Sequence, residues 1–142
     1  QFASSAASDV YKRQILMEKV ARNVLKHRRR FRALVLVADQ SPGERDNVYW
    51  TDWLNQPTAF FTGPATIAQL MDFPVMFARC RRKSRGRYHL SLIPIVETPG
   101  QLTEEGIIEA YIRAAEETIR DEPESFLWSN RRWKHQPPAD QA

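Results

Sequence analysis

One short apolar run constrains the fold of this chain more than any other feature. Residues 33–38 read ALVLVA, without a polar side chain. Such a run is typical of a β-strand that is covered on both faces, as in parallel sheets. It ends at Asp39 and Gln40, which are followed by the turn-forming sequence Ser41-Pro42-Gly43. Because ligands of open α/β sheets bind beyond the carboxyl ends of the strands, Asp39 and Gln40 are candidate site residues.

A helix and a second strand are predicted further along the chain. Pro64 suits the first turn of a helix, and Pro74 disfavours helical geometry in the residue before it, which places the helix end near Asp72. Residues 75–78, VMFA, form a second short apolar run. A strand, a crossover with a helix and another strand make a βαβ unit, whose strands are parallel. We therefore predict an α/β fold with a mixed, partly parallel sheet flanked by helices.

Three further elements follow from hydrophobic spacing. Apolar residues recur every three to four positions in residues 15–26 and 104–120, which predicts two helices. Thr103 is a plausible N-cap of the second helix, whose outer, solvated face should include Glu116. Alternation in residues 88–93 predicts an antiparallel strand after a basic turn with Gly86. The half-buried face of this strand should carry Tyr88, Leu90 and Leu92.

The segment between residues 39 and 63 is predicted to be a long loop rich in aromatic side chains. A connection of this length inside a compact domain is usually functional or disordered. Its aromatic residues require burial or an apolar ligand, which makes Trp50, Phe60 and Phe61 candidate substrate contacts. The alternative is that these rings form a satellite core beneath the loop.

Composition excludes several classes of site. The chain has 142 residues, a single cysteine (Cys80) and three well-separated histidines, so no disulfide or zinc framework is expected. The sequence has no Gly-rich phosphate loop, no GxSxG elbow and no HExxH helix. His135 and Asp140 fit the spacing H-x4-D, but they flank two prolines in a polar tail. Catalysis needs a rigid scaffold, so we interpret this match as chance.

The chain divides into three parts by composition. Residues 1–14 are small, polar and aperiodic, resemble a translated library adaptor, and are predicted to be non-native. Residues 15–135 carry the periodic apolar pattern of a folded domain. Residues 136–142 contain two prolines and no core residues, and are predicted to be a loose tail.

Much of the positive charge falls in three clusters, residues 28–32, 81–87 and 131–134, in a chain of net charge +4. Such clusters favour phosphorylated lipids, an anionic membrane surface or an acidic partner protein. Ordinary surface charge is an alternative for each cluster. A small nucleic-acid-binding module is a second alternative, because aromatic side chains beside arginines are typical of it. That module should show one continuous basic face.

Three ordered motifs resemble one known family. They are residues 38–43 (ADQSPG), 60–65 (FFTGPA) and 126–134 (FLWSNRRWK). Their order and approximate spacing resemble the bacterial lipid A biosynthesis (lauroyl/myristoyl) acyltransferases of the lysophospholipid acyltransferase superfamily, most closely the forms in Bacteroidetes-type bacteria. The resemblance covers nearly all of residues 15–135. It departs from the family at Asn130, where a histidine is usual.

The resemblance implies a glycerolipid acyltransferase-like fold and transfer of a fatty acyl group from acyl carrier protein to a hydroxyl of a lipid A precursor. It implies no metal or organic cofactor, and a location at the cytoplasmic face of the inner membrane. The family's H-x4-D/E motif would lie upstream of Ile15. We therefore expect this chain to be the C-terminal part of the domain, incomplete at its N-terminus and without the membrane anchor or the general-base histidine.

Site roles follow from the resemblance together with the residue types. Asp39 is predicted to be an active-site carboxylate that orients the base or an arginine, with Gln40 as its hydrogen-bond partner. An Asx-type turn cap is the alternative for Asp39. A catalytically inactive lipid-binding relative is the alternative for the whole chain, and no nucleic acid partner is expected. The predicted substrate-binding residues are Arg28, Arg30, Trp50, Phe60, Phe61, Arg131 and Arg132.

Overall fold

The computed structural model describes residues 20–27, 33–43 and 46–137, which fall into two compact units divided between Leu34 and Val35. The first unit contains helix α2 (Val20–Lys26), which lies within the helix predicted from hydrophobic spacing. Lys26 occupies its last turn, where the helix dipole favours positive charge.

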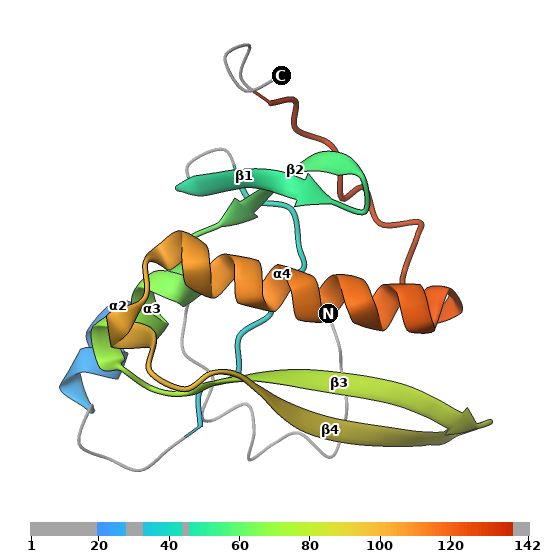
Figure 1. The fold of residues 1–142 in the computed structure, drawn as a ribbon, viewed down its shortest axis with the longest axis horizontal. Coiled ribbons are helices and arrows are strands. Elements are labelled where there is room, and N and C mark those ends of the chain that lie inside the picture. Colours follow the sequence, from blue (N-terminus) through green and yellow to red (C-terminus); the bar gives the residue numbers. More distant parts are fainter. Residues whose placement is uncertain (1–19, 28–32, 44–45, 138–142) are drawn as a thin grey trace. The chain divides into compact units, whose positions relative to one another are not determined.

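The second unit is built around two β-hairpins and a long helix (Figure 1). Strands β1 (Val48–Trp53) and β2 (Gln56–Phe61) form one antiparallel hairpin, and β3 (Val75–Ser84) and β4 (Arg87–Val96) form the other. Between them in sequence lies α3 (Gly63–Met71), and after them come η2 (Pro99–Gln101), α4 (Glu104–Asp121) and η3 (Pro123–Ser125). In Figure 1, α4 lies between the two hairpins, and it contacts both.

The core forms where α4 packs against the β1–β2 hairpin. The ring of Trp53 meets the ring of Phe60 edge to face at 5.6 Å, an arrangement that aromatic quadrupoles favour. Both rings are at most 3% exposed. The apolar face predicted for α4 is confirmed, since Ile112 is fully buried. The core cluster consists of Trp53, Phe60, Ala65, Ile107, Ile108, Ile112 and Ile119.

Local helix signals were predicted correctly. Thr103 caps α4, because its Oγ1 accepts a hydrogen bond from the Gly106 backbone N–H at 3.2 Å. Helix α3 ends at Asp72, which adopts a left-handed conformation with φ 51°. No helix within the described ranges is long and apolar enough to cross a membrane.

The strand predicted over residues 33–38 is wrong. This segment pairs with no other strand among the described residues, and Val35 and Val37 are 87% and 64% exposed. Both described sheets are two-stranded and antiparallel, so the predicted parallel pairing with residues 75–78 is absent from them. A central strand needs neighbours on its edges, whereas each hairpin here pairs only within itself. The mixed α and β class is confirmed, and the partly parallel sheet is not.

The long loop predicted over residues 39–63 contains the β1–β2 hairpin instead. Its two-residue turn places Leu54 and Asn55 at φ 52° and 62°, the backbone that a tight hairpin turn requires. Asparagine tolerates this conformation and leucine does so rarely. The Leu54-Asn55 pair therefore gave only a weak turn signal in the sequence.

Two predictions of exposure are also wrong. Tyr88, Leu90 and Leu92 point away from the core at 66%, 63% and 63% exposure. The opposite face of this hairpin packs on α4, because Arg79 and Arg81 on that face form ion pairs with Asp121. Glu116, predicted to lie on a solvated face, is 8% exposed. It accepts hydrogen bonds from the Leu54 backbone N–H, Arg113 and Arg120.

Candidate functional site

Hydrogen bonds join two segments that lie about 90 residues apart in sequence. Ser41 Oγ donates to the backbone carbonyls of Arg132 at 2.6 Å and Arg131 at 3.2 Å. His135 Nε2 donates to the carbonyl of Pro42 at 2.9 Å, and Pro42 is buried. These contacts align residues 39–43 with residues 130–135. The first and third sequence motifs therefore meet in the folded chain.

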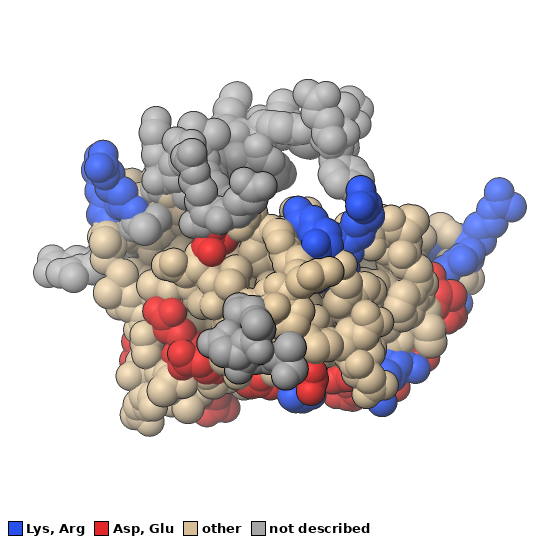
Figure 2. Space-filling view, turned by 90° about the horizontal axis from the view of Figure 1, so that it is seen from above, with Lys and Arg blue, Asp and Glu red and all other residues tan. Residues whose placement is uncertain are grey.

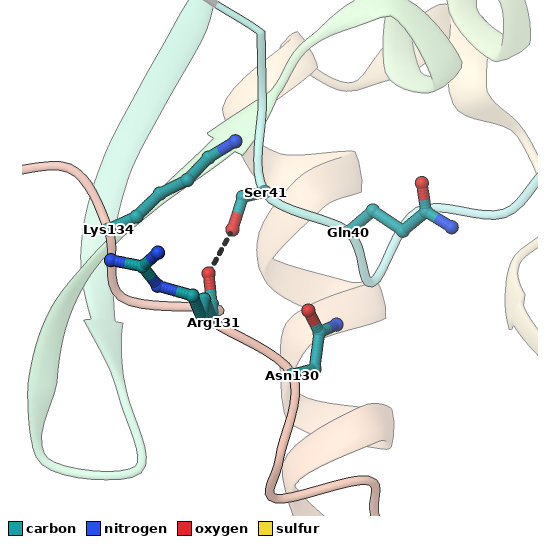
Figure 3. A pocket seen from close by; sticks show the side chains of 5 residues that line it. All are labelled: Gln40, Ser41, Asn130, Arg131 and Lys134. Atoms are coloured by element: carbon teal, nitrogen blue, oxygen red, sulfur yellow. Dashed lines mark hydrogen bonds between the residues drawn. The ribbon is translucent and has the colours of Figure 1, made fainter.

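An open pocket of about 360 Å³ lies between these segments. Figure 3 shows the side chains of Arg131 and Lys134 on one side of Ser41, and the amides of Gln40 and Asn130 on the other. Two cations together with amide donors suit an anionic group, and an arginine guanidinium can bind a phosphate or carboxylate through two parallel hydrogen bonds. The pocket is therefore suited to the headgroup of an anionic substrate.

Arg132 follows the pocket residue Arg131 in the chain and is 1% exposed. Its Nη2 donates to the carbonyl of Ala59 in β2 at 2.7 Å, and its guanidinium carbon lies 4.5 Å from the Phe60 ring centroid and 5.5 Å from that of Trp53. Burial lowers the pKa of Arg132, and its electrostatic interactions with Tyr111 and Asp39 oppose that change. The side chain thus links the third motif to the core.

Asp39 lies at the surface near this buried cation. Its carboxylate interacts electrostatically with Arg132, and it adds to the effect of burial in raising the pKa of Tyr111. Its carboxylate accepts no hydrogen bond from any residue that the structure describes, which does not support the turn-cap alternative. The neighbouring turn is instead stabilised by Asp46, whose Oδ2 accepts from the Gly43 N–H at 2.7 Å. Asp39 is therefore an accessible carboxylate beside a buried arginine.

The second motif reaches the same place through strand β2. Trp133 Nε1 donates to Thr58 Oγ1 at 2.9 Å, and its ring lies 5.8 Å from that of Trp53. Together with the Arg132–Ala59 bond, this contact holds residues 132–133 against β2 just before the FFTGPA motif. All three motifs thus converge on one region of the second unit.

The structure separates the predicted site residues into groups. Gln40 and Arg131 line the pocket, and Asp39 is adjacent to Gln40 in the chain. Phe60 and Arg132 are buried in the core, a placement that favours a structural role, and Phe61 is half-buried. Trp50 lines a separate pocket of about 500 Å³ beside the β1–β2 hairpin. The predicted substrate contacts stay predictions, and Arg28 and Arg30 lie outside the described residues.

Sequence reasoning did not assign a site role to several residues that the structure brings together. Ser41 was interpreted only as part of a turn, since its partners lie some 90 residues away and leave no local signal. Tyr111 of α4 packs against the core cluster and interacts electrostatically with Asp39 and Arg132. Lys134 was noted as one cation of a cluster, and its spacing from Arg131 could have indicated a shared pocket. No group of metal-ligating side chains occurs within the described ranges.

Comparison with known proteins agrees with the motifs. The family model described as bacterial lipid A biosynthesis acyltransferase matches residues 10–135, which is most of the chain. The comparison with curated proteins finds no match. The matched range includes the pocket and all three motifs that converge on it. The chain therefore belongs to the bacterial lipid A biosynthesis acyltransferase family.

Proposed function

We propose that this chain takes part in transferring a fatty acyl group from an acyl carrier protein thioester to a hydroxyl of a lipid A precursor or a related membrane lipid. Family membership supports acyl transfer in lipid A biosynthesis in general. The observation that carries the finer proposal is the meeting of the motifs at a pocket with two exposed cations, Arg131 and Lys134. Lipid A precursors carry phosphate groups, which such a pocket suits.

The proposed reaction is a direct attack of the acceptor hydroxyl oxygen on the thioester carbonyl carbon. A carbon–oxygen bond forms, the carbon–sulfur bond breaks, and the carrier thiolate leaves with the electron pair. A general base removes the hydroxyl proton, which returns to the departing sulfur. We propose that this base is the histidine of the family's H-x4-D/E motif.

Asp39 has a distinct role in this proposal. It is accessible, and it lies close enough to Arg132 to raise the pKa of that buried side chain against the effect of burial. A carboxylate in this position can orient either the base or an arginine. Gln40 follows it along the rim of the pocket and supplies a neutral hydrogen-bonding group.

The proposed setting is the cytoplasmic face of the inner membrane, where the lipid acceptor resides. The alternative of a nucleic-acid-binding module expects one continuous basic face. Arg79 and Arg81 are instead paired with Asp121 of α4. This pairing divides the positive charge of the β3–β4 hairpin between two faces and favours the acyltransferase proposal.

The test uses the protein expressed from its complete coding sequence, with an acyl carrier protein thioester and a phosphorylated lipid A precursor. Asp39→Asn is expected to lower kcat at least about a hundredfold, in the range of general acid–base groups, while thermal stability is retained. The matched control is Glu124→Gln, an exposed carboxylate in η3. Unchanged transfer in Asp39→Asn would refute a catalytic role for this carboxylate, and absence of transfer by the unsubstituted protein would refute the proposed reaction.

A further inference from the structure

The outer face of the β3–β4 hairpin is apolar and exposed. Side chains on this face alternate with those that pack on α4, and cross-strand pairs such as Ala78–Leu92 and Cys80–Leu90 lie along it. Leu90 and Leu92 are each 63% exposed, and Met76 is 44% exposed. Exposed apolar patches of this kind usually mark an interaction surface.

The end of the same hairpin is strongly basic. Arg82, Lys83, Arg85 and Arg87 are all exposed, and none forms an ion pair with a residue that the structure describes. No acidic residue occurs between Val75 and Val96. The tip of the hairpin lies at the right of Figure 1, and basic side chains project at the right of Figure 2.

The two faces of the hairpin differ in how their cations are used. On the inner face, Arg79 contacts Glu117 and Asp121, and Arg81 contacts Asp121 and Glu122. These acidic residues come from α4 and its C-terminal end, and they fix the hairpin against the helix. The tip cations have no such partners among the described residues. The charge that remains available to a partner therefore adjoins the apolar face.

Tyr88 connects the two regions. It lies opposite Arg82 in the strand register and is 66% exposed, with the leucines on one side and the basic tip on the other. Tyrosine is enriched at membrane interfaces because its ring is apolar and its hydroxyl is polar. Apolar side chains, an interfacial tyrosine and adjoining unpaired cations together match the chemistry of an anionic bilayer surface.

We propose that the outer face of the β3–β4 hairpin docks on an anionic lipid bilayer, with its leucines in contact with the acyl boundary and its tip cations on lipid phosphates. The inference rests on the proposed function in one respect, since a bilayer is where a lipid acceptor is found. The proposal assigns contact with the bilayer to the β3–β4 hairpin. Binding to vesicles requires no acyl transfer, so failure of either proposal can be distinguished from failure of the other.

The experiment uses the 142-residue chain, in which Cys80 is the single cysteine and lies exposed on the outer face. An environment-sensitive fluorophore on Cys80 is followed while vesicles are added. Vesicles of phosphatidylglycerol and phosphatidylethanolamine are expected to shift the emission to shorter wavelength, and vesicles of phosphatidylcholine to give a much smaller shift. Raising the salt concentration should weaken binding, because the tip charges are exposed to solvent.

Matched variants separate the two parts of the surface. Leu90→Gln with Leu92→Gln should weaken binding at least about tenfold, since each buried leucine is worth more than that factor in full transfer. Leu70→Gln is the control, because Leu70 lies on α3 with a similar exposure of 60%. Arg82→Gln with Arg87→Gln should weaken binding roughly 25-fold, at about fivefold per cation. Arg22→Gln with Lys26→Gln removes the same charge from exposed positions on α2.

Each alternative outcome would overturn the proposal. Equal loss in Arg22→Gln with Lys26→Gln would show that binding follows net charge, and equal loss in Leu70→Gln would show that it follows any exposed leucine. No emission shift with anionic vesicles would show that this face stays out of the bilayer. A larger shift with a DNA or RNA oligonucleotide than with vesicles would assign the face to nucleic acid. A shift that depends on protein concentration without vesicles, with dimers in sedimentation, would assign it to a second copy of the chain.

Discussion

Replacement of Arg132 by methionine should destabilise the fold, whereas the same replacement at the adjacent Arg131 should leave stability nearly unchanged. Arg132 is 1% exposed and is held against β2 and two aromatic rings. Arg131 is exposed and lines the pocket. The two substitutions change the same atoms at neighbouring positions, so any difference between them reports the surroundings of each side chain.

The magnitude follows from the contacts of Arg132. Loss of a charged hydrogen bond to the Ala59 carbonyl costs about 1.5–3 kcal/mol, and loss of cation–π contacts with Phe60 and Trp53 costs about 1–2 kcal/mol. Methionine refills much of the space, and removing a buried cation returns roughly 1–2 kcal/mol of desolvation. These ranges give a net loss centred on about 2 kcal/mol, or roughly 6 °C in Tm at about 3 °C per kcal/mol.

Urea denaturation followed by tryptophan fluorescence measures this difference, because Trp53 and Trp133 lie within the affected region. Arg131→Met should stay within about 0.5 kcal/mol of the unsubstituted chain, as for most surface positions. Equal midpoints for the two variants would refute the reasoning. So would a larger loss in Arg131→Met.

Two further predictions concern other contacts of the second unit. The pKa of Glu116 is lowered chiefly by its hydrogen bond with Arg120, with a further contribution from the Leu54 N–H. The stability that ionised Glu116 contributes is therefore complete above about pH 5 and is lost as pH falls through the lowered pKa. Glu116→Gln should flatten the acid side of the unfolding free energy against pH in urea titrations, whereas the exposed Glu124→Gln should not, and parallel curves would contradict this. Ser41→Ala should lose about 1 kcal/mol in the same assay, because the Arg131 and Arg132 carbonyls lose the hydroxyl that donates to them. Ser41→Thr keeps a hydroxyl and should retain most of that stability, so equal stability of the two variants would argue against the contact.

Local signals in the sequence predicted the helices well. Thr103 and the apolar spacing after it determine where α4 begins and which face it buries. Pro64 marks the start of α3, and Asp72 marks its end. These features depend on residues within a few positions of one another, which is why sequence alone was sufficient.

Long-range pairing was not predictable in the same way. Residues 33–38 have strand composition, but a strand forms only with a partner, and none pairs with them in the described structure. The face of β4 that packs inward depends on Arg79 meeting Asp121, 42 residues away. The family resemblance placed Arg131 and Arg132 together in one motif. Only the folded arrangement shows that one lines the pocket and the other is part of the core.

The central claim is that the pocket of Arg131 and Lys134 binds the anionic headgroup of the lipid acceptor during acyl transfer. Its most direct test compares two acceptors, a phosphorylated lipid A precursor and its dephosphorylated analogue, using protein from the complete coding sequence. Arg131→Gln with Lys134→Gln should raise KM for the phosphorylated acceptor about tenfold or more, since each charged hydrogen bond is worth about 1.5–3 kcal/mol, and should change KM for the analogue little. Equal effects on both acceptors, or no effect on either, would contradict the claim.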